Sequence, residues 1–92
     1  MRPYIVTFNL LADSSGRSPV AVKLERDYPS AKKVTETSYF IASNQDPGTI
    51  YDDLKGALGT QHMIYICALH CPYFGYGTSD LNQWFTDNVE WN

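Results

Sequence analysis

The sequence predicts an α+β fold in which helices cover one face of an antiparallel sheet. Apolar and β-branched runs typical of strands alternate along the chain with amphipathic segments typical of helices. Two of these segments begin with a capping side chain followed by proline, at Ser18-Pro19 and Asp46-Pro47. An apolar fraction of 43% in 92 residues is enough for one packed core. We therefore expect a single domain over residues 1–92.

The first half of the chain predicts a strand, a helix and a hairpin. The first strand is expected over residues 3–10, where aromatic and β-branched residues dominate. The helix that begins at Ser18-Pro19 is expected to end near Asp27 or Tyr28, because Pro29 limits it. Residues 32–43 are again β-branched and aromatic. They predict a hairpin or one sharply bent strand, with the break near Glu36-Thr37.

The second half predicts a helix, a strand and a final short helix. Ile50, Leu54 and Leu58 form the apolar stripe of the helix that begins at Asp46-Pro47, and Gly59 is expected to close it. Residues 62–69 are nearly continuous in apolar character, which is typical of a strand covered on both faces. The last helix is expected to begin at Thr78 or Ser79 and to bury Leu81, Trp84, Phe85 and Val89 on one side.

This order of elements is that of a ferredoxin-like βαββαβ sandwich, built from two split βαβ units. Its core spans about residues 3–69, and residues 70–92 form a C-terminal extension rich in aromatic residues. No basic residue follows Lys55, so we expect these aromatics to cover the sheet or a partner subunit rather than to stack on bases. They are Tyr73, Phe74, Tyr76, Trp84, Phe85 and Trp91.

Charge and composition restrict the partners and the location. Residues 1–46 carry six basic and five acidic side chains, whereas residues 47–92 carry one basic and five acidic ones. An acidic chain gains little from counterion release, so charge does not favour nucleic acid as a partner, although nucleic-acid and protein partners both stay open. No apolar run approaches the roughly 20 residues that span a bilayer. Met1-Arg2 leads directly into a strand pattern rather than a signal peptide. We expect a cytoplasmic protein with no membrane partner.

Several weak motifs occur in a recognisable order between residues 4 and 86. Thr7-Phe8-Asn9-Leu10 resembles a "strand–Tyr–Asp–Leu" opening, and residues 36–41 resemble a "Glu-Ser-Thr-Trp-aliphatic-Ile" core strand. Ile50 to Lys55, the strand Met63 to Leu69 and a Gly-aromatic turn before Trp84-Phe85 follow. Together they resemble the SinR-like branch of the small ferredoxin-fold proteins related to the CRISPR adaptation endonuclease subunit and to VapD-type toxins.

The resemblance implies a homodimer whose sheets meet across a two-fold axis. In active relatives it also implies metal-dependent phosphodiester cleavage, with an acid at the end of the first strand of each subunit. Asn9 occupies that position here. Two Asn side chains offer only neutral oxygens where the family pattern carries two negative charges, whereas Mg²⁺ and Mn²⁺ favour charged oxygen ligands.

Two functions therefore stay open. One is a non-catalytic homodimeric binding protein that needs no cofactor. The other is a metal-dependent DNA or RNA endonuclease, in which Asp13 replaces the missing acid and Mg²⁺ or Mn²⁺ is the cofactor. Asn9 also has a purely structural interpretation, as a side chain that ends a strand by hydrogen-bonding its own turn.

The remaining candidate sites have ordinary structural interpretations as well. Ser14, Ser15 and Arg17 precede a helix N-terminus and could contact a phosphate, although short polar loops before helices are common. A zinc site is not expected, because strand geometry points the side chains to opposite faces at Cys67, His70 and Cys71, with His62 upstream. We expect Cys67 to be a core cysteine.

Two groups of charged residues also have structural interpretations. Asp52-Asp53 is expected to offset the N-terminal dipole of the second helix. Four basic residues are expected to form a solvated face rather than a nucleic-acid groove, namely Lys23, Arg26, Lys32 and Lys33.

Overall fold

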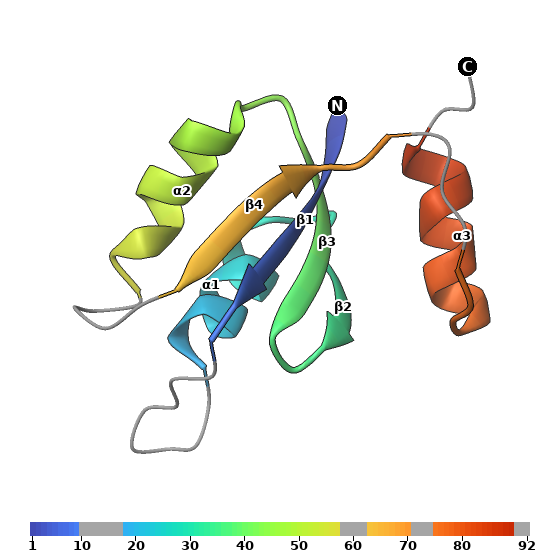
Figure 1. Ribbon diagram of the computed structural model, residues 1–92, viewed down its shortest axis with the longest axis horizontal. Helices are drawn as coiled ribbons and strands as arrows, with labels where there is room; N and C mark the ends of the chain where they lie inside the picture. The colour runs from blue at the N-terminus through green and yellow to red at the C-terminus, as the bar shows by residue number, and fades with distance from the viewer. Residues whose placement is uncertain (10–17, 58–62, 71–74, 90–92) are drawn as a thin grey trace.

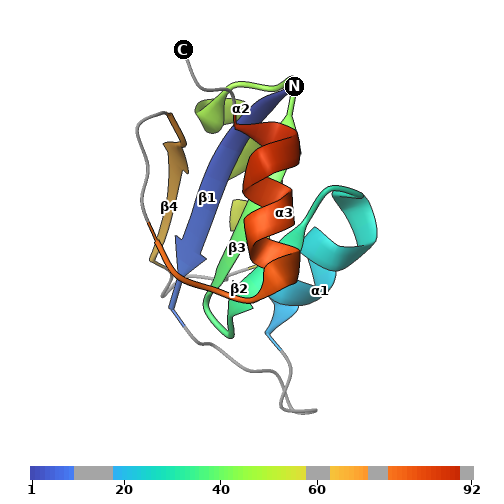
Figure 2. The same cartoon turned by 90° about the vertical axis from the view of Figure 1, so that its right-hand side faces the viewer.

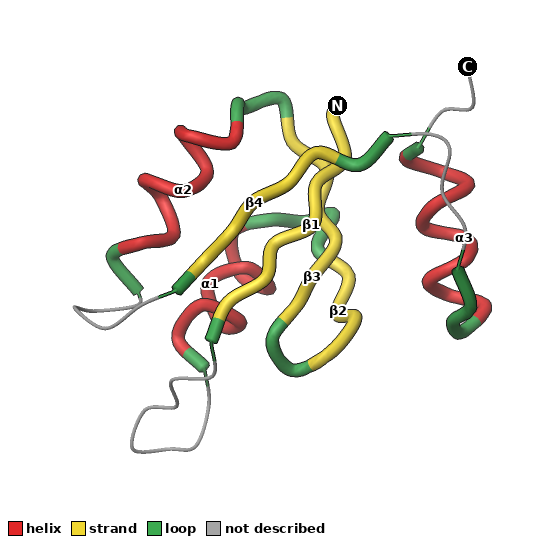
Figure 3. Tube along the Cα trace, in the orientation of Figure 1, coloured by secondary structure: helices red, strands yellow, loops and turns green. Residues whose placement is uncertain are grey.

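The computed structural model describes residues 1–9, 18–57, 63–70 and 75–89. Their strands and helices form an α+β arrangement (Figures 1 and 3). In chain order the elements are β1 (Arg2–Phe8), α1 (Pro19–Asp27), β2 (Lys32–Thr35), β3 (Ser38–Ser43), α2 (Pro47–Lys55), β4 (Ile64–Ala68) and α3 (Ser79–Asn88).

The strands form one sheet in the order β2-β3-β1-β4, and all neighbouring strands are antiparallel. The predicted α+β class is confirmed, and the arrangement is compatible with a small ferredoxin-like fold. The predicted hairpin is also confirmed, since β2 and β3 are joined by a turn at Glu36-Thr37. Within the described residues, no helix has the length and apolar character needed to cross a membrane.

The three helix starts follow the capping logic of the sequence. Ser18 accepts a hydrogen bond from the Ala21 N–H, and Pro19 is the first residue of α1. Asp46 caps α2 in the same way, with its carboxylate 2.7 Å from the Thr49 nitrogen. Thr78 caps α3. The predicted starts at residues 18, 46 and 78 are therefore confirmed.

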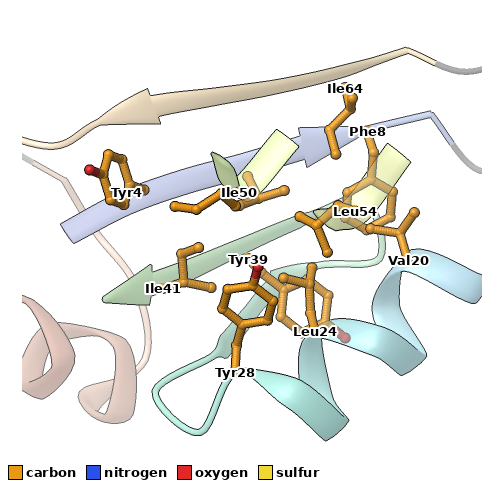
Figure 4. Close-up of a cluster of buried hydrophobic side chains, with 11 residues drawn as sticks. Tyr4, Phe8, Val20, Leu24, Tyr28, Tyr39, Ile41, Ile50, Leu54 and Ile64 are labelled. Carbon is orange, nitrogen blue, oxygen red and sulfur yellow. The ribbon is translucent and has the colours of Figure 1, made fainter. Parts of the chain in front are cut away.

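The main core lies between the sheet and the helices α1 and α2 (Figure 4). Alternate residues of β1 point into it because successive side chains of a strand face opposite sides. β3 contributes Tyr39 and Ile41, and the helices contribute the predicted Ile50 and Leu54 together with Val20 and Leu24. The buried members are Tyr4, Val6, Phe8, Val20, Leu24, Tyr28, Tyr39, Ile41, Ile50, Leu54 and Ile64.

A second, smaller core lies on the opposite face of the sheet, where α3 packs (Figure 2). Trp84 stacks on Phe40 at 5.2 Å between ring centroids, and Phe85 meets Phe40 edge-on at 4.8 Å. The Trp84 indole N–H donates to the Ser30 carbonyl at 3.0 Å. Leu81 and Val89 join the cluster, so the predicted apolar side of the last helix is confirmed.

Three sequence predictions for the second half are wrong. α2 ends at Lys55 with Gly56 as its cap residue, rather than at Gly59, which lies outside the described residues together with Leu58. β4 is not covered on both faces, because it is an edge strand of the sheet and α3 does not pack over it. Cys67 is consequently exposed rather than part of the core.

The second core predicts a large cost for removing its central side chain. Trp84 is only 8% exposed. Trp84→Ala should therefore lower the free energy of unfolding by about 3–5 kcal/mol, from lost burial and the cavity left behind. Urea denaturation followed by circular dichroism measures this. Tyr76→Ala is the matched control, because Tyr76 is fully exposed, and it should change stability by no more than about 0.5 kcal/mol. Equal effects of the two variants would show that α3 does not dock as described.

Candidate functional site

Asn9 lies at the end of β1, where it extends the pairing of β1 with β4 by one more residue pair. Its backbone N–H donates to the Met63 carbonyl at 3.0 Å. Its side-chain Oδ1 accepts the Met63 N–H at 2.8 Å, in place of the backbone carbonyl that would normally do so. Asn9 therefore links two strands across the sheet, 54 residues apart in sequence.

The other residues predicted to act with Asn9 lie outside the described residues. They are Asp13, Ser14, Ser15 and Arg17. Their roles as a replacement metal ligand or as phosphate contacts stay predictions. The described structure thus brings Asn9 together with Met63, and it tests none of the polar groups expected from the following loop.

The histidine and cysteine residues do not form a site among the described residues. Cys67 is on β4 and His70 follows that strand, both exposed, whereas His62 and Cys71 are outside the described residues. No group of three or more His, Cys, Asp or Glu side chains that could hold a metal ion occurs in the part of the chain that the structure describes.

The clearest polar cluster joins α1 to α2. The Lys23 ammonium lies 2.9 Å from an Asp27 carboxylate oxygen and 3.5 Å from one of Asp53. The Tyr28 hydroxyl donates to Asp53 at 2.7 Å. Arg26 holds the other side of Asp27 through two hydrogen bonds of 2.9 and 3.0 Å. No local sequence pattern predicts this cluster, because the Tyr28–Asp53 contact joins residues that lie far apart in the chain.

The cluster corrects the interpretation of Asp52 and Asp53. Neither residue is in the first turn of α2, so they do not offset its N-terminal dipole. Asp52 instead accepts a hydrogen bond from Lys55 at 3.1 Å, and Asp53 binds Lys23 of α1 and Tyr28, the residue that caps the C-terminus of α1. The pair therefore has structural partners along and between helices.

Charge and burial shift the pKa values within this cluster. Hydrogen bonds from Arg26 and then Lys23 hold the pKa of the Asp27 carboxyl far below its usual range. Burial, followed by the hydrogen bond to Asp53, raises the pKa of the Tyr28 hydroxyl. The hydrogen bond to Asp27 raises the pKa of Lys23. Each shift favours the form already engaged in a bond, which is the behaviour of a structural link rather than of a proton-transfer group.

Two cavities lie near the second core and the N-terminus, and neither is lined by Asn9. One, of about 500 Å³, is lined by residues 1–4 together with Pro47, residues 68–70, Asn88 and Val89. The other, of about 460 Å³, lies between α3 and the Val34–Phe40 region. Both cavities adjoin the apolar second core.

No family model, curated protein or solved structure matches this chain.

The Asn9 link predicts a modest but specific effect on stability. Asn9→Ala leaves the Met63 N–H without its 2.8 Å acceptor. It should lower the free energy of unfolding by about 0.5–1.5 kcal/mol, the usual net value of one hydrogen bond. Urea denaturation measures the change. Asn44→Ala, at an exposed position that does not join strands, is the control and should remain close to the native chain. An effect no larger at Asn9 than at Asn44 would contradict the structural role.

The Asp27 pairings predict a pH dependence at the acid end. Because the pKa of Asp27 is lowered in the folded state, Asp27 stabilises the fold in full above its unfolded pKa of about 3.8. That contribution is lost as pH falls from about 4 toward the lower folded pKa. Between pH 5 and pH 2, the free energy of unfolding should therefore fall less steeply with decreasing pH for Asp27→Asn than for the native chain. Urea denaturation at a series of pH values measures it. Parallel profiles would mean that the bonds to Arg26 and Lys23 are not kept in solution.

Proposed function

We propose that this chain is a non-catalytic, ferredoxin-like homodimeric interaction protein that acts in the cytoplasm. In this proposal it is a SinR-like relative of the CRISPR adaptation nucleases that has kept the scaffold and lost the metal site. One observation carries the proposal. The position that matches the strand-end acid of that family is Asn9, and its side chain is engaged in linking β1 to β4.

Coordination chemistry supports a non-catalytic role. Two Asn side chains related by a two-fold axis would offer no formal charge to a divalent cation, whereas two carboxylates would offer two negative charges. The Asn9 Oδ1 also accepts the Met63 N–H at 2.8 Å, so one of its lone pairs is already directed at the protein. A hard cation would have to compete with that bond for a neutral ligand.

The placement of the basic residues supports a protein partner rather than nucleic acid. Lys23 and Arg26 are both paired with Asp27, and Lys32 lies 3.5 Å from Asp80 of α3. A groove for phosphates needs cations that are not already balanced by neighbouring carboxylates. The basic face expected from the sequence is therefore largely neutralised by acids of the same chain, and a second copy is the partner that we favour.

The test is a cleavage assay on single- and double-stranded DNA and RNA with Mn²⁺, run with and without chelator. We expect no chelator-sensitive cleavage by the native chain, because Asn9 supplies no charged ligand. Asn9→Asp and Asp13→Ala are assayed beside it, with a known metal-dependent nuclease as positive control for the substrates.

Two results have opposite meanings for this proposal. Cleavage that appears only in Asn9→Asp would support an intact scaffold whose metal site has been neutralised. Chelator-sensitive cleavage by the native chain would overturn the proposal, and its loss in Asp13→Ala would assign the activity to the loop that follows β1.

A further inference from the structure

Among the described residues, the edge strand β4 lacks the features that normally prevent pairing with another chain. β4 ends the order β2-β3-β1-β4, and no described strand lies beyond it (Figure 2). Residues 63–69 contain no charged side chain and no proline. Met63 and Tyr65 are 56% and 63% exposed, although both are large and apolar. An uncharged, apolar edge of this kind is a template for strand addition.

The opposite edge of the same sheet is protected. β2 carries Lys32 and Lys33, and its pairing with β3 shifts register between Lys33 and Thr35. Lysines and bulges are two common means of blocking an edge. Asp80 of α3 also reaches Lys32 at 3.5 Å, which holds the helix beside this strand. The contrast singles out β4 as the open edge.

The hydrogen-bonding pattern fixes which backbone groups of β4 face outward. Asn9 donates to the Met63 carbonyl, and Leu69 donates to the Pro3 carbonyl, at 3.0 Å each. In an antiparallel ladder such bonded pairs recur at every second residue. The backbone N–H and C=O groups therefore point toward β1 at residues 63, 65, 67 and 69. They point away from β1 at Ile64, Ile66 and Ala68.

We propose that β4 pairs antiparallel with β4 of a second copy, about a two-fold axis through Ile66. This inference rests on the homodimer of the proposed function and names its contact surface, in which the two Asn9 side chains lie at opposite ends of the paired strands rather than together at the two-fold axis. Ile66 pairs with its own counterpart, and Ile64 pairs with the partner's Ala68. In this register all three outward-facing residues pair with outward-facing residues of the partner strand. With a two-fold axis at Tyr65 or Cys67, only two of them do so. The result is one continuous sheet across both subunits.

A second copy fits this edge for two reasons. The outward-facing residues are spaced evenly about Ile66, so the strand is complementary to itself when reversed. The chain has a net charge of −3, yet residues 63–69 are uncharged, so pairing brings no like charges together at the contact. Tyr65 then lies opposite the partner's Cys67 on the face away from α2, and pairing covers part of its exposed ring.

Disulfide trapping tests this register. Tyr65 and the partner's Cys67 form a pair without direct hydrogen bonds, for which Cα atoms are about 4.5 Å apart, within the range that a disulfide bridges. The parent is Cys71→Ser, which leaves Cys67 as the one thiol. Tyr65→Cys in this parent should give a covalent dimer on mild oxidation, seen on a non-reducing gel and reversed by reductant.

Two single-thiol chains are the matched controls. The parent alone should stay largely uncoupled, because Cys67 and its counterpart are diagonal in this register. The variant Tyr65→Cys with Cys67→Ser should stay uncoupled for the same reason. Rapid coupling of the parent would place the axis at Cys67, and rapid coupling of the other chain would place it at Tyr65. Either result would overturn the Ile66 register.

Sedimentation velocity separates the failure of this surface from the failure of the homodimer. The native chain should sediment as a dimer, and Tyr65→Lys should shift it to monomer, because a lysine on the edge opposes pairing. Tyr76→Lys, at another exposed tyrosine, should leave the dimer intact. A dimer that resists Tyr65→Lys and forms no disulfide would overturn the β4 contact alone. A monomer at all concentrations would overturn the homodimer as well.

Discussion

Strand β3 is the constraint on which the rest of the structure depends, because it is buried on both faces. Tyr39 and Ile41 point into the core beneath α1 and α2, and the intervening Phe40 and Ala42 point the other way. A two-layer sandwich would leave Phe40 in water. The C-terminal helix α3 removes that exposure by placing Trp84 on the Phe40 ring. The extension is therefore a third layer required by the sheet, rather than an accessory to a finished domain.

This third layer covers only half of the sheet, and the asymmetry determines where contacts with other molecules can form. α3 packs over β2 and β3, where Lys32 and Asp80 hold it. The same face of β4 carries Tyr65 and Cys67, both exposed. When one edge of a sheet is protected and the other is apolar, a strand of another chain pairs preferentially with the apolar edge. The proposed homodimer follows from that difference between the edges.

The sequence predicts structural features that depend on neighbouring residues. It does not predict features that depend on contacts between residues far apart in the chain. Ser18-Pro19 and Asp46-Pro47 specify helix starts through local capping bonds, so both were predictable. Strand β4 was misjudged, because an apolar run looks the same at the centre of a sheet and at its edge. Its position depends on the strand order, which is not local. The Tyr28–Asp53 bond was missed for the same reason, since it needs α1 and α2 to be adjacent. For the candidate site, the sequence identified Asn9 as the unusual position but not its partner Met63.

Asn9 also connects the two proposals physically. Its two bonds to Met63 fix the register of β4 against β1, and that register decides that Ile64, Ile66 and Ala68 face outward. A carboxylate at Asn9 could accept the same Met63 N–H, but it would place a negative charge at the end of an uncharged edge in each subunit. With a divalent cation bound, that charge is neutralised and useful. Without the cation it opposes both the packing of the strand end and the approach of a second acidic chain. In the proposed homodimer the sheet is used for pairing and holds no metal, so a neutral amide is the side chain expected at this position.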